Sequence, residues 1–350
     1  MKILITGGCG FLGTNLSSHF LKLGCQVVII DALYRKGGER NLKWLRELDT
    51  NGELFFHQVD ISDIEKLTSI FKNYLNLDYV CHVAGQVAMT TSIENPRSDL
   101  MTNVVGSFNI LECVRKYSPN ALVAYSSTNK VYGDLTWLNL NENETRYYSE
   151  LYPNGLDEKI PLDFSTPYGC SKGSADQYFR DWSRVYGIKT VVFRHSSIYG
   201  GRQFASFDQG WIGWFCLQAI NQCEILKSSN EIDKFSISGT GKQVRDVLHS
   251  SDLVDLYHVA YQNKDSVSGK IFNIGGGISN SLSLLELFQI LQNKLNINNL
   301  YFKKLKRRES DQDFFVADIS YVKSIINWEP KVSFDVGIDQ MIDWTKKMMK

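Results

Sequence analysis

The sequence has no excess of charge of either sign, because 38 lysines and arginines balance 38 aspartates and glutamates. Coating a nucleic acid or contacting a membrane through a polybasic surface needs surplus cations, so this balance argues against both kinds of partner. A local basic pocket for one anionic ligand remains compatible with it.

Long hydrophobic runs are missing as well. The longest, near 211–220, has about half the length that a membrane span needs. The N-terminal residues MKILITGG contain neither the apolar region nor the cleavage site of a signal peptide. We therefore expect no membrane partner.

Cysteine is scarce and unpatterned, since the seven cysteines are odd in number and form no CxxC pair. We expect neither a bound metal nor a disulfide framework, and a reducing cytoplasm as the location. What is present is ordinary: 43% hydrophobic and 22% charged residues in 350 suit a folded globule with a well-developed core.

Short apolar, β-branched runs alternate with helical patterns over the first two-thirds of the chain. Such runs predict strands that are buried on both faces, and their alternation with helices predicts a doubly wound parallel sheet of the Rossmann type, an α/β fold. The predicted strands are Ile3–Thr6, Val27–Ile30, Leu54–Gln58, Tyr79–Val83, Leu122–Tyr125 and Thr190–Phe193. The predicted helices are 11–23, 39–49, 63–74, 98–117 and 167–186.

Two segments interrupt this alternation. Residues 134–164 are rich in Asn, Glu and Tyr, which predicts a long surface excursion of the kind that is usually functional or faces a partner. After Arg194 the pattern becomes irregular, which predicts a smaller, mixed C-terminal lobe. We place the sheet domain at 1–194 with 240–265 returning to it, and the smaller lobe at 195–239 and 266–350.

Three glycines follow the first predicted strand in GGCGFLG and open a helix. Gly7 permits a tight turn, Gly10 lets the backbone approach a pyrophosphate, and Gly13 lets the helix pack on the strand. The phosphates would then meet the positive end of the helix dipole. A chance glycine turn is the alternative, which this strand–turn–helix context disfavours.

Asp31 closes the second strand, where a carboxylate accepts hydrogen bonds from ribose hydroxyls and repels a 2′-phosphate, so NAD is favoured over NADP. Arg35 and Lys36 could meet such a phosphate, although a solvated loop is the simpler interpretation. Asp60 and Ile61 follow the third strand. There an acid can accept from an adenine amino group or cap the helix expected to begin at Ser62.

Small residues in Ala84-Gly85-Gln86 follow the fourth strand, where a ribose has to pass. Thr102 and Asn103 lie on the next predicted helix. For these two residues the sequence leaves contact with the cofactor open.

Tyr168 and Lys172 stand four residues apart in PYGCSK, so both side chains point into one cleft if the segment is helical. A tyrosine with its ordinary pKa of about 10 is a poor base. The Lys172 cation and a positive nicotinamide ring both favour phenolate, so we expect a lowered pKa for Tyr168 and a role as base toward a substrate hydroxyl. The alternative is an exposed amphipathic helix.

The run Tyr125–Thr128 ends the fifth predicted strand, at the carboxyl edge where doubly wound sheets bind ligands. Thr128 can donate a hydrogen bond to the substrate oxygen that becomes a carbonyl. Spacing alone does not separate Ser126, Ser127 and Thr128, and a hydroxyl-capped strand end is the alternative.

Together these residues resemble the extended short-chain dehydrogenase/reductase family, and within it the nucleotide-sugar epimerases and dehydratases. The resemblance spans nearly the whole chain through GGCGFLG, HVAGQ, SSTNKVYGD, PYGCSK, GKQVRDVLH and RRESD. Two longer strings, AGQVAMTTSIENP and FRHSSIYGGRQFASFDQGWIGWF, are similar to the branch that acts on carbon 2 of a CDP-linked 3,6-dideoxyhexose.

This resemblance implies a catalytic role for three residues: Tyr168 as base, Lys172 as its electrostatic partner and Thr128 as hydroxyl donor. The residues implied in NAD binding are Gly7, Gly10, Phe11, Leu12, Gly13, Asp31, Arg35, Lys36, Asp60, Ile61, Ala84, Gln86, Thr102, Tyr168, Lys172 and Ser196. Those implied in substrate binding are Thr128, Ser197, Gln209, Gly213, Trp214, Phe215, Arg245 and Arg308. The two arginines suit a diphosphate because guanidinium forks bind phosphate oxygens in pairs.

The chain departs from the family at a few positions. Thr128 stands where the 4-epimerases usually have serine, and Ser197 where asparagine is frequent. The 4,6-dehydratases have an Asp-Glu pair after the threonine for the loss of water, but this chain has Asn129 and Lys130. Neither residue offers a carboxylate, so dehydration loses its general acid and base.

The activity that the resemblance implies is inversion of carbon 2 of the CDP-linked sugar through a transient 2-keto sugar, with NAD staying bound. A UDP-sugar 4-epimerase of the same fold is the nearest alternative. A net dehydrogenase and a non-catalytic NAD-binding sensor are the others. The family also implies a homodimer or homotetramer.

Overall fold

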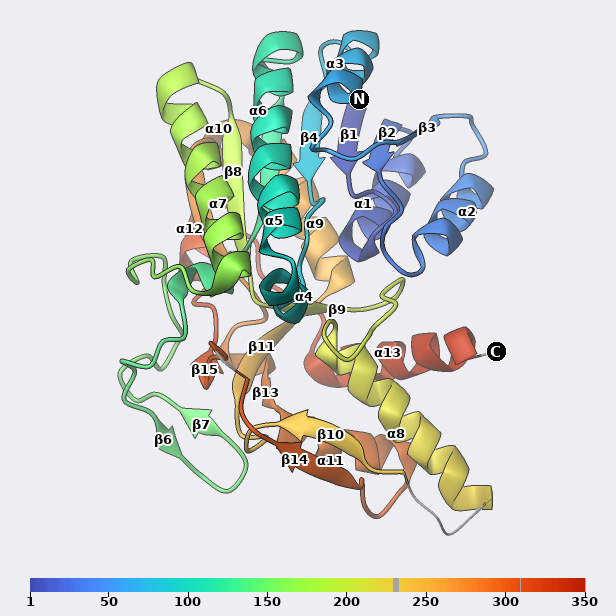
Figure 1. Ribbon diagram of the computed structural model, residues 1–350, viewed down its shortest axis with the longest axis vertical. Helices are drawn as coiled ribbons and strands as arrows, with labels where there is room; N and C mark the ends of the chain where they lie inside the picture. The colour runs from blue at the N-terminus through green and yellow to red at the C-terminus, as the bar shows by residue number, and fades with distance from the viewer. Residues whose placement is uncertain (229–232, 309, 350) are drawn as a thin grey trace.

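The computed structural model describes residues 1–228, 233–308 and 310–349, and its larger part is built on a seven-stranded parallel sheet (Figure 1). The strand order is β12-β8-β5-β4-β1-β2-β3, which is that of a doubly wound, Rossmann-type α/β fold. The strands are β1 (Lys2–Thr6), β2 (Gln26–Asp31), β3 (Leu54–Gln58), β4 (Tyr79–His82), β5 (Leu122–Thr128), β8 (Thr190–His195) and β12 (Lys270–Ile274).

Helices cover both faces of this sheet, which is why its central strands are buried except for Lys2 at the start of β1. On one face pack α1 (Phe11–Lys22), α2 (Gly38–Leu48), α9 (Ser250–Gln262), α10 (Lys264–Val267) and α12 (Ser320–Ile326). On the other pack α3 (Ile64–Asn73), α6 (Gly106–Tyr117) and α7 (Thr166–Tyr186). Two short helices, α4 (Met89–Glu94) and α5 (Pro96–Leu100), precede α6.

The smaller lobe lies below the carboxyl edge of the large sheet (Figure 1). Its strands form one sheet around β11 and a separate pair, β10 with β14. These strands are β9 (Ser197–Tyr199), β10 (Phe235–Ser238), β11 (Val244–His249), β13 (Ser281–Ser283), β14 (Phe302–Leu305) and β15 (Phe314–Phe315). Its helices are α8 (Trp211–Ser228), α11 (Leu284–Leu295) and α13 (Phe334–Met349), which share an aromatic and aliphatic core.

The excursion at 134–164 packs on this lobe. It contains a short hairpin of β6 (Asn141–Glu142) and β7 (Tyr147–Tyr148). Its later part is tied to the smaller lobe, since the Leu156 amide donates to the Val316 carbonyl at 2.7 Å. Leu156 and Ile160 join a hydrophobic cluster with Phe314 and Phe315.

The two halves are also joined by a stacked arginine. The guanidinium of Arg202 lies 3.6 Å from the ring centroid of Trp44 on α2 and 5.1 Å from that of Trp344 on α13. Beside it, the Asn15 side chain of α1 donates to the Gly201 carbonyl at 3.0 Å. Three segments that are distant in sequence therefore meet at this stack.

The predicted fold class is confirmed, and all six predicted strands belong to the large sheet. The predicted helix 98–117 is divided, because a π-helical turn at Met101–Val105 separates α5 from α6. Residues 240–265 were expected to return to the sheet domain; their strand β11 joins the smaller sheet, and their helix α9 packs on the large one. Strand β12 was expected in the smaller lobe but pairs with β8 of the large sheet. In the described ranges, no helix has both the length and the hydropathy to cross a membrane.

Candidate active site

The glycine turn after β1 has the geometry that an anion needs. A Cβ on Gly13 would lie 2.0 Å from the Gly7 carbonyl oxygen, so only glycine lets α1 start this close to the strand. Gly7 has a φ of +68° and would meet the Ala84 backbone at 2.8 Å. Helix α1 has no side-chain cap at Gly10 and no acid in its first turn. Its first amides therefore fit the pyrophosphate of a dinucleotide.

Asp31 organises the loop that follows β2. One carboxylate oxygen accepts from the Cys9 amide at 2.9 Å and the other from the Leu33 amide at 2.8 Å. Carboxylate oxygens retain further lone pairs that suit ribose hydroxyls. Arg35 and Lys36 are both exposed, and Arg35 donates to Gln209 Oε1 of the smaller lobe at 2.5 Å.

Asp60 shapes the turn after β3 by accepting from the amide and the hydroxyl of Ser62, each at 2.8 Å. The alternative role of Asp60 as a helix cap is wrong, because α3 begins at Ile64 and Asp63 caps it through the Lys66 amide. Ile61 is buried against Gly106, and a Cβ on Gly106 would lie 2.5 Å from the Ile61 side chain.

The loop at Ala84-Gly85-Gln86 is held by Asn103. The Asn103 side chain accepts from the Gln86 amide at 2.9 Å and donates to the Gln86 carbonyl at 3.0 Å. Asn103 therefore supports the loop, while Thr102 lies half-buried on the π-helical turn. Ser196, after β8, donates to the Asp246 carbonyl at 3.1 Å. Phe11 and Leu12 form the half-buried first turn of α1.

The three predicted catalytic residues lie together at the carboxyl edge of β5. Tyr168 and Lys172 project from α7, and Thr128 is the last residue of β5. All three are buried, with 9%, 3% and 6% of their surface exposed respectively. The Thr128 side chain lies close enough to the Tyr168 hydroxyl to lower its pKa. The Lys172 Nζ donates to the Ser126 carbonyl at 2.5 Å and lies 4.4 Å from the centroid of the Tyr125 ring.

Burial controls the protonation of this pair. It raises the pKa of Tyr168, against the lowering effects of the Thr128 hydrogen bond and of Arg35. We expected a lowered pKa for Tyr168, and for the protein's own groups this expectation is wrong. The free energy lost when the phenolate leaves water exceeds the stabilisation that these partners provide. Burial also lowers the pKa of Lys172 to about 7, with Asp99 and Asp176 acting in the opposite direction.

The three neighbouring hydroxyls that spacing could not separate have different partners. Ser126 Oγ lies 3.1 Å from His195 Nδ1, and Ser127 Oγ donates to Asp176 at 2.8 Å. Asp176 is held in turn by a two-pronged contact with Arg194, at 2.9 and 2.8 Å. Thr128 is thus the hydroxyl of this run that reaches Tyr168, and its two neighbours fix the strand end.

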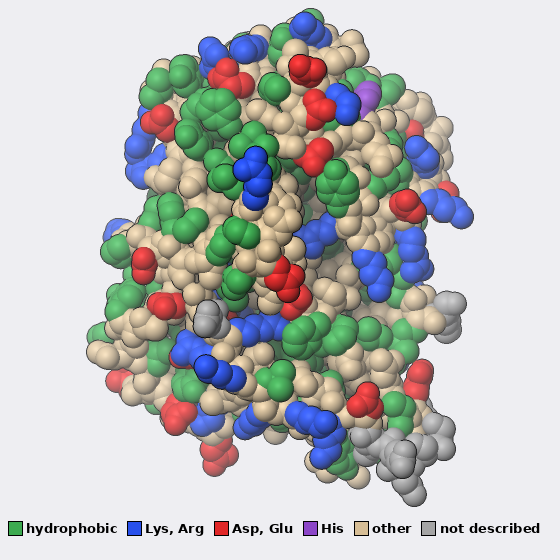
Figure 2. Space-filling view, in the orientation of Figure 1, with side chains coloured by type: hydrophobic (Ala, Val, Ile, Leu, Met, Phe, Trp, Pro, Cys, Tyr) green, Lys and Arg blue, Asp and Glu red, His purple; other side chains and the backbone are tan. Residues whose placement is uncertain are grey.

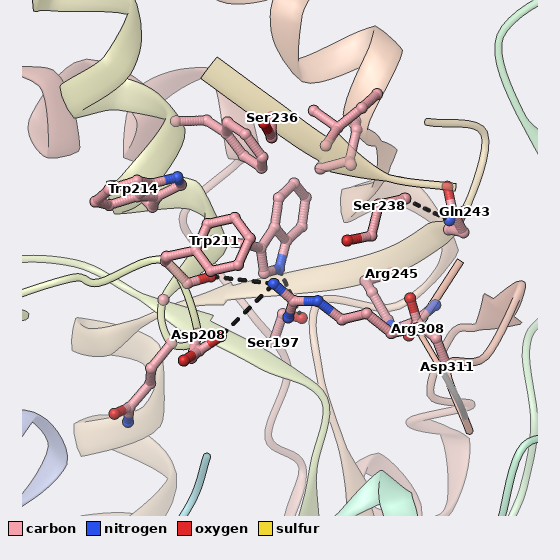
Figure 3. A pocket seen from close by; sticks show the side chains of 16 residues that line it. Ser197, Asp208, Trp211, Trp214, Ser236, Ser238, Gln243, Arg245, Arg308 and Asp311 are labelled. Atoms are coloured by element: carbon pink, nitrogen blue, oxygen red, sulfur yellow. Dashed lines mark hydrogen bonds and ion pairs between the residues drawn. The ribbon is translucent and has the colours of Figure 1, made fainter. Parts of the chain in front are cut away.

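A pocket in the smaller lobe gathers most of the predicted substrate residues (Figure 3). It is lined by Ser197, Phe207, Asp208, Gln209, Gly210, Trp211, Trp214, Phe215, Ser236, Ile237, Ser238, Gln243, Arg245, Leu284, Arg308 and Asp311. Aromatic rings and the β10 serines form its walls, and the two arginines reach its mouth with Asp208 and Asp311. This mixture suits a nucleoside with an anionic group attached.

Two predicted substrate residues lie outside this pocket. Thr128 belongs to the catalytic group at the edge of the large sheet. Gly213 faces the protein interior, since a Cβ there would lie 2.4 Å from the Met341 side chain and 3.0 Å from that of Ala205. Gly213 therefore serves helix packing.

Asp311 is the main pocket residue that the sequence prediction missed. Its carboxylate binds Arg245 at 2.8 Å and Lys130 at 3.6 Å, while Arg308 pairs with Asp208 at 3.7 Å. Its place at the end of the RRESD string was the available signal. Trp211, which also lines the pocket, donates to Ser197 Oγ at 3.0 Å.

The two positions that depart from the dehydratases face the smaller lobe. Asn129 donates to Gln312 Oε1 at 2.9 Å, and Lys130 donates to the Ser310 carbonyl at 3.3 Å. Burial lowers the pKa of Lys130 to about 8. An amide and an amine therefore stand beside Thr128, and neither is a carboxylic acid.

Comparison with known proteins gives consistent results. The NAD dependent epimerase/dehydratase family matches residues 3–275. The CDP-paratose 2-epimerase of Salmonella typhi is 53% identical over 348 residues, covering 99% of this chain and 100% of that protein. A putative UDP-glucose 4-epimerase of Methanocaldococcus jannaschii is 30% identical, with 98% of each chain covered.

Solved structures share the fold along the whole chain. The UDP-glucose 4-epimerase of Thermotoga maritima with UDP-glucose has a TM-score of 0.81 at 26% identity, covering 100% of both chains. The UDP-glucose 4-epimerase of Thermus thermophilus in complex with NAD has a TM-score of 0.79 at 23% identity, covering 99% of both chains.

Proposed function

Since this chain belongs to the NAD dependent epimerase/dehydratase family, we propose that it is an NAD-dependent epimerase that interconverts CDP-paratose and CDP-tyvelose by inverting carbon 2 of the sugar. The observation that carries the proposal is the 53% identity, along essentially the full length of both chains, to a CDP-paratose 2-epimerase. The arrangement of Thr128, Tyr168 and Lys172 beside the glycine turn supports it.

The chemistry that NAD supplies when bound is reversible hydride transfer to and from a sugar carbon. The protein holds the cofactor through the free amides of α1, Asp31 and the loop at Ala84–Gln86. Thr128 and Tyr168 meet the reacting hydroxyl, and Tyr168 takes its proton while Thr128 donates a hydrogen bond to the oxygen. We assign Lys172, four residues from Tyr168 on α7, as the electrostatic partner of Tyr168.

The smaller lobe supplies binding far from the reacting carbon. Arg245 and Arg308 bind the diphosphate, and the aromatic pocket holds the nucleoside, with Ser197, Gln209, Trp214 and Phe215 in its walls. Such remote binding retains the oxidised sugar while it turns to present its other face. Water is not removed, because Asn129 and Lys130 provide no carboxylic acid.

The test is to incubate the purified protein with CDP-paratose, CDP-tyvelose and UDP-glucose side by side and to follow the products by NMR. We expect inversion at carbon 2 of the CDP-sugars with no net release of reduced cofactor. Inversion at carbon 4 of UDP-glucose instead would favour a 4-epimerase. Sustained absorbance near ~340 nm would identify a dehydrogenase, since the hydride would then leave with the cofactor.

A non-catalytic NAD-binding sensor is the remaining alternative. It needs the glycine turn but has no use for Thr128, Tyr168 and Lys172 together. Reduction of the bound cofactor by an added CDP-sugar would exclude it.

We further propose that the protein is a homodimer or homotetramer of the cytoplasm. Hydrophobic side chains gather over α6 and α7 (Figure 2), where Phe108 and Tyr178 contact each other edge to face with 38% and 39% of their surface exposed. An exposed aromatic cluster of this kind suits a contact with another copy.

All seven cysteines are free thiols, which fits a reducing compartment.

A further inference from the structure

The proposed mechanism leaves one carboxylate near the site unused. Asp99, on α5, is fully buried. One of its oxygens accepts a hydrogen bond from Ser171 Oγ, and the other lies 3.5 Å from Asn103 Nδ2. In the part of the chain that the structure describes, no lysine or arginine forms an ion pair with Asp99. A buried carboxylate with hydrogen bonds alone is costly unless another charge compensates it.

Lys172 is the cation that acts on this carboxylate: burial raises the pKa of Asp99, and the charge of Lys172 lowers it. Ser171, which binds Asp99, immediately precedes Lys172 on α7. A Cβ on Gly85 would lie 3.0 Å from Asn103 Oδ1 and 3.6 Å from Lys172 Nζ, so Asn103 and Lys172 flank the same glycine. The Asn103 side chain therefore contacts Asp99 and lies beside the glycine that Lys172 also approaches.

Among the other titratable groups near Lys172, Asp176 also raises its pKa, with a smaller effect than Asp99. Burial lowers the pKa of His82 on β4 and of His195 on β8 to about 3, with Lys172 as a second cause, so both rings are neutral. Burial raises the pKa of Tyr125 on β5, which keeps that phenol neutral. The charge of Asp176 on α7 is already matched by Arg194 at 2.8 Å.

We propose that Asp99 is a positioning residue for the reaction, whose carboxylate is the buried counter-charge that keeps Lys172 protonated beside Tyr168. The proposal rests on the acid–base roles proposed above for Tyr168 and Lys172. Asp99 raises the pKa of both residues, because a negative charge favours the ammonium form of one and the neutral phenol of the other.

The test is Asp99→Asn, which keeps the shape and one of the two accepted hydrogen bonds but removes the charge. Since Asp99 raises both pKa values, its loss moves the acid limb and the basic limb of the pH profile of kcat to lower pH, by about 0.5–1 unit each. On the basic side kcat then falls about 3- to 10-fold, while on the acid side it is kept or rises. Asp99→Ser is the second charge-free variant, in case the amide does not fold.

The matched control is Asp181→Asn, the same change at an exposed position of α7, which leaves both limbs in place. A second readout does not need turnover. In NAD-loaded protein carrying ¹³C at the lysine ε-carbon, the Lys172 signal is assigned by its loss in Lys172→Met. Its titration midpoint falls in Asp99→Asn and stays in Asp181→Asn.

The two readouts separate this proposal from the proposed function. Lost activity with unmoved limbs and an unchanged Lys172 midpoint would show that Asp99 serves packing only, and would overturn the proposal while CDP-sugar epimerisation stands. If wild-type protein turns over no CDP-sugar, the proposed function fails, and the Lys172 midpoint still decides whether Asp99 is its counter-charge.

Discussion

At the scale of single residues, Tyr168 carries two opposing effects. Burial disfavours its phenolate, whereas the Thr128 hydroxyl and Arg35 favour it. In the protein alone the phenol therefore stays protonated at neutral pH, and formation of its phenolate depends on the cations that assemble around it. The proposed mechanism assigns this hydroxyl to proton transfer.

We predict that Tyr168→Phe keeps NAD bound and loses about 10²- to 10⁴-fold in turnover, the usual range for a general base. The ring still fills its site, so folding is unaffected. Turnover of the CDP-sugar and the ratio of cofactor to protein after gel filtration measure the two effects. Activity close to that of the wild type would remove Tyr168 from the role of base.

The lowered pKa of Lys172 predicts that the stability of the protein depends on pH. Its pKa of about 7 in the folded protein lies below the ordinary 10.5, so between these pH values the unfolded chain binds more protons than the folded one. The free energy of unfolding therefore rises with pH across this window through this group. Lys172→Met should show a smaller rise in denaturant titrations at pH values of about 7, 8.5 and 10. Equal rises in the two proteins would contradict it.

At the scale of elements, the contact between β1 and α1 is the most constrained. Gly13→Ala would place a methyl group 2.0 Å from the Gly7 carbonyl oxygen, against backbone that cannot move aside. We expect a loss of about 1–3 kcal/mol in stability, as for other overpacked sites, together with loss of NAD binding. Thermal unfolding and cofactor retention measure both.

The control is Gly201→Ala, because nothing lies within 4 Å of a Cβ at that position. It should unfold at the wild-type temperature and keep its cofactor. A stable Gly13→Ala protein that still holds NAD would show that the turn is looser than its geometry indicates.

Elements defined by local patterns could be predicted, and those defined by distant partners could not. The run Leu54–Gln58 has the bounds of β3, because alternation of strand and helix is visible within a short window. Strand β12 is recognised only by its pairing with β8, about eighty residues earlier in the chain.

The site shows the same division. Tyr168 and Lys172 follow from spacing, whereas the Arg35–Gln209 contact and the burial that raises the pKa of Tyr168 are tertiary effects.

At the scale of the whole molecule, the exposed aromatic face over α6 and α7 predicts the assembly. Tyr178→Asp places a charge where Phe108 and Trp182 contact the Tyr178 ring. We expect the oligomer to dissociate to monomers in sedimentation velocity, because a buried, unpaired charge opposes association. Leu23→Asp, at an exposed position just after α1, is the control that stays assembled. An unchanged sedimentation coefficient for Tyr178→Asp would place the interface elsewhere.

The stack of Arg202 between Trp44 and Trp344 has an optical consequence. Indole emission responds to the polarity around the ring and to nearby charge, and these two indoles belong to opposite halves of the molecule. Any swing of one half away from the other must withdraw the guanidinium and admit water to both rings. A change in tryptophan emission that is absent in Trp44→Phe would therefore report a separation of the two halves at this stack.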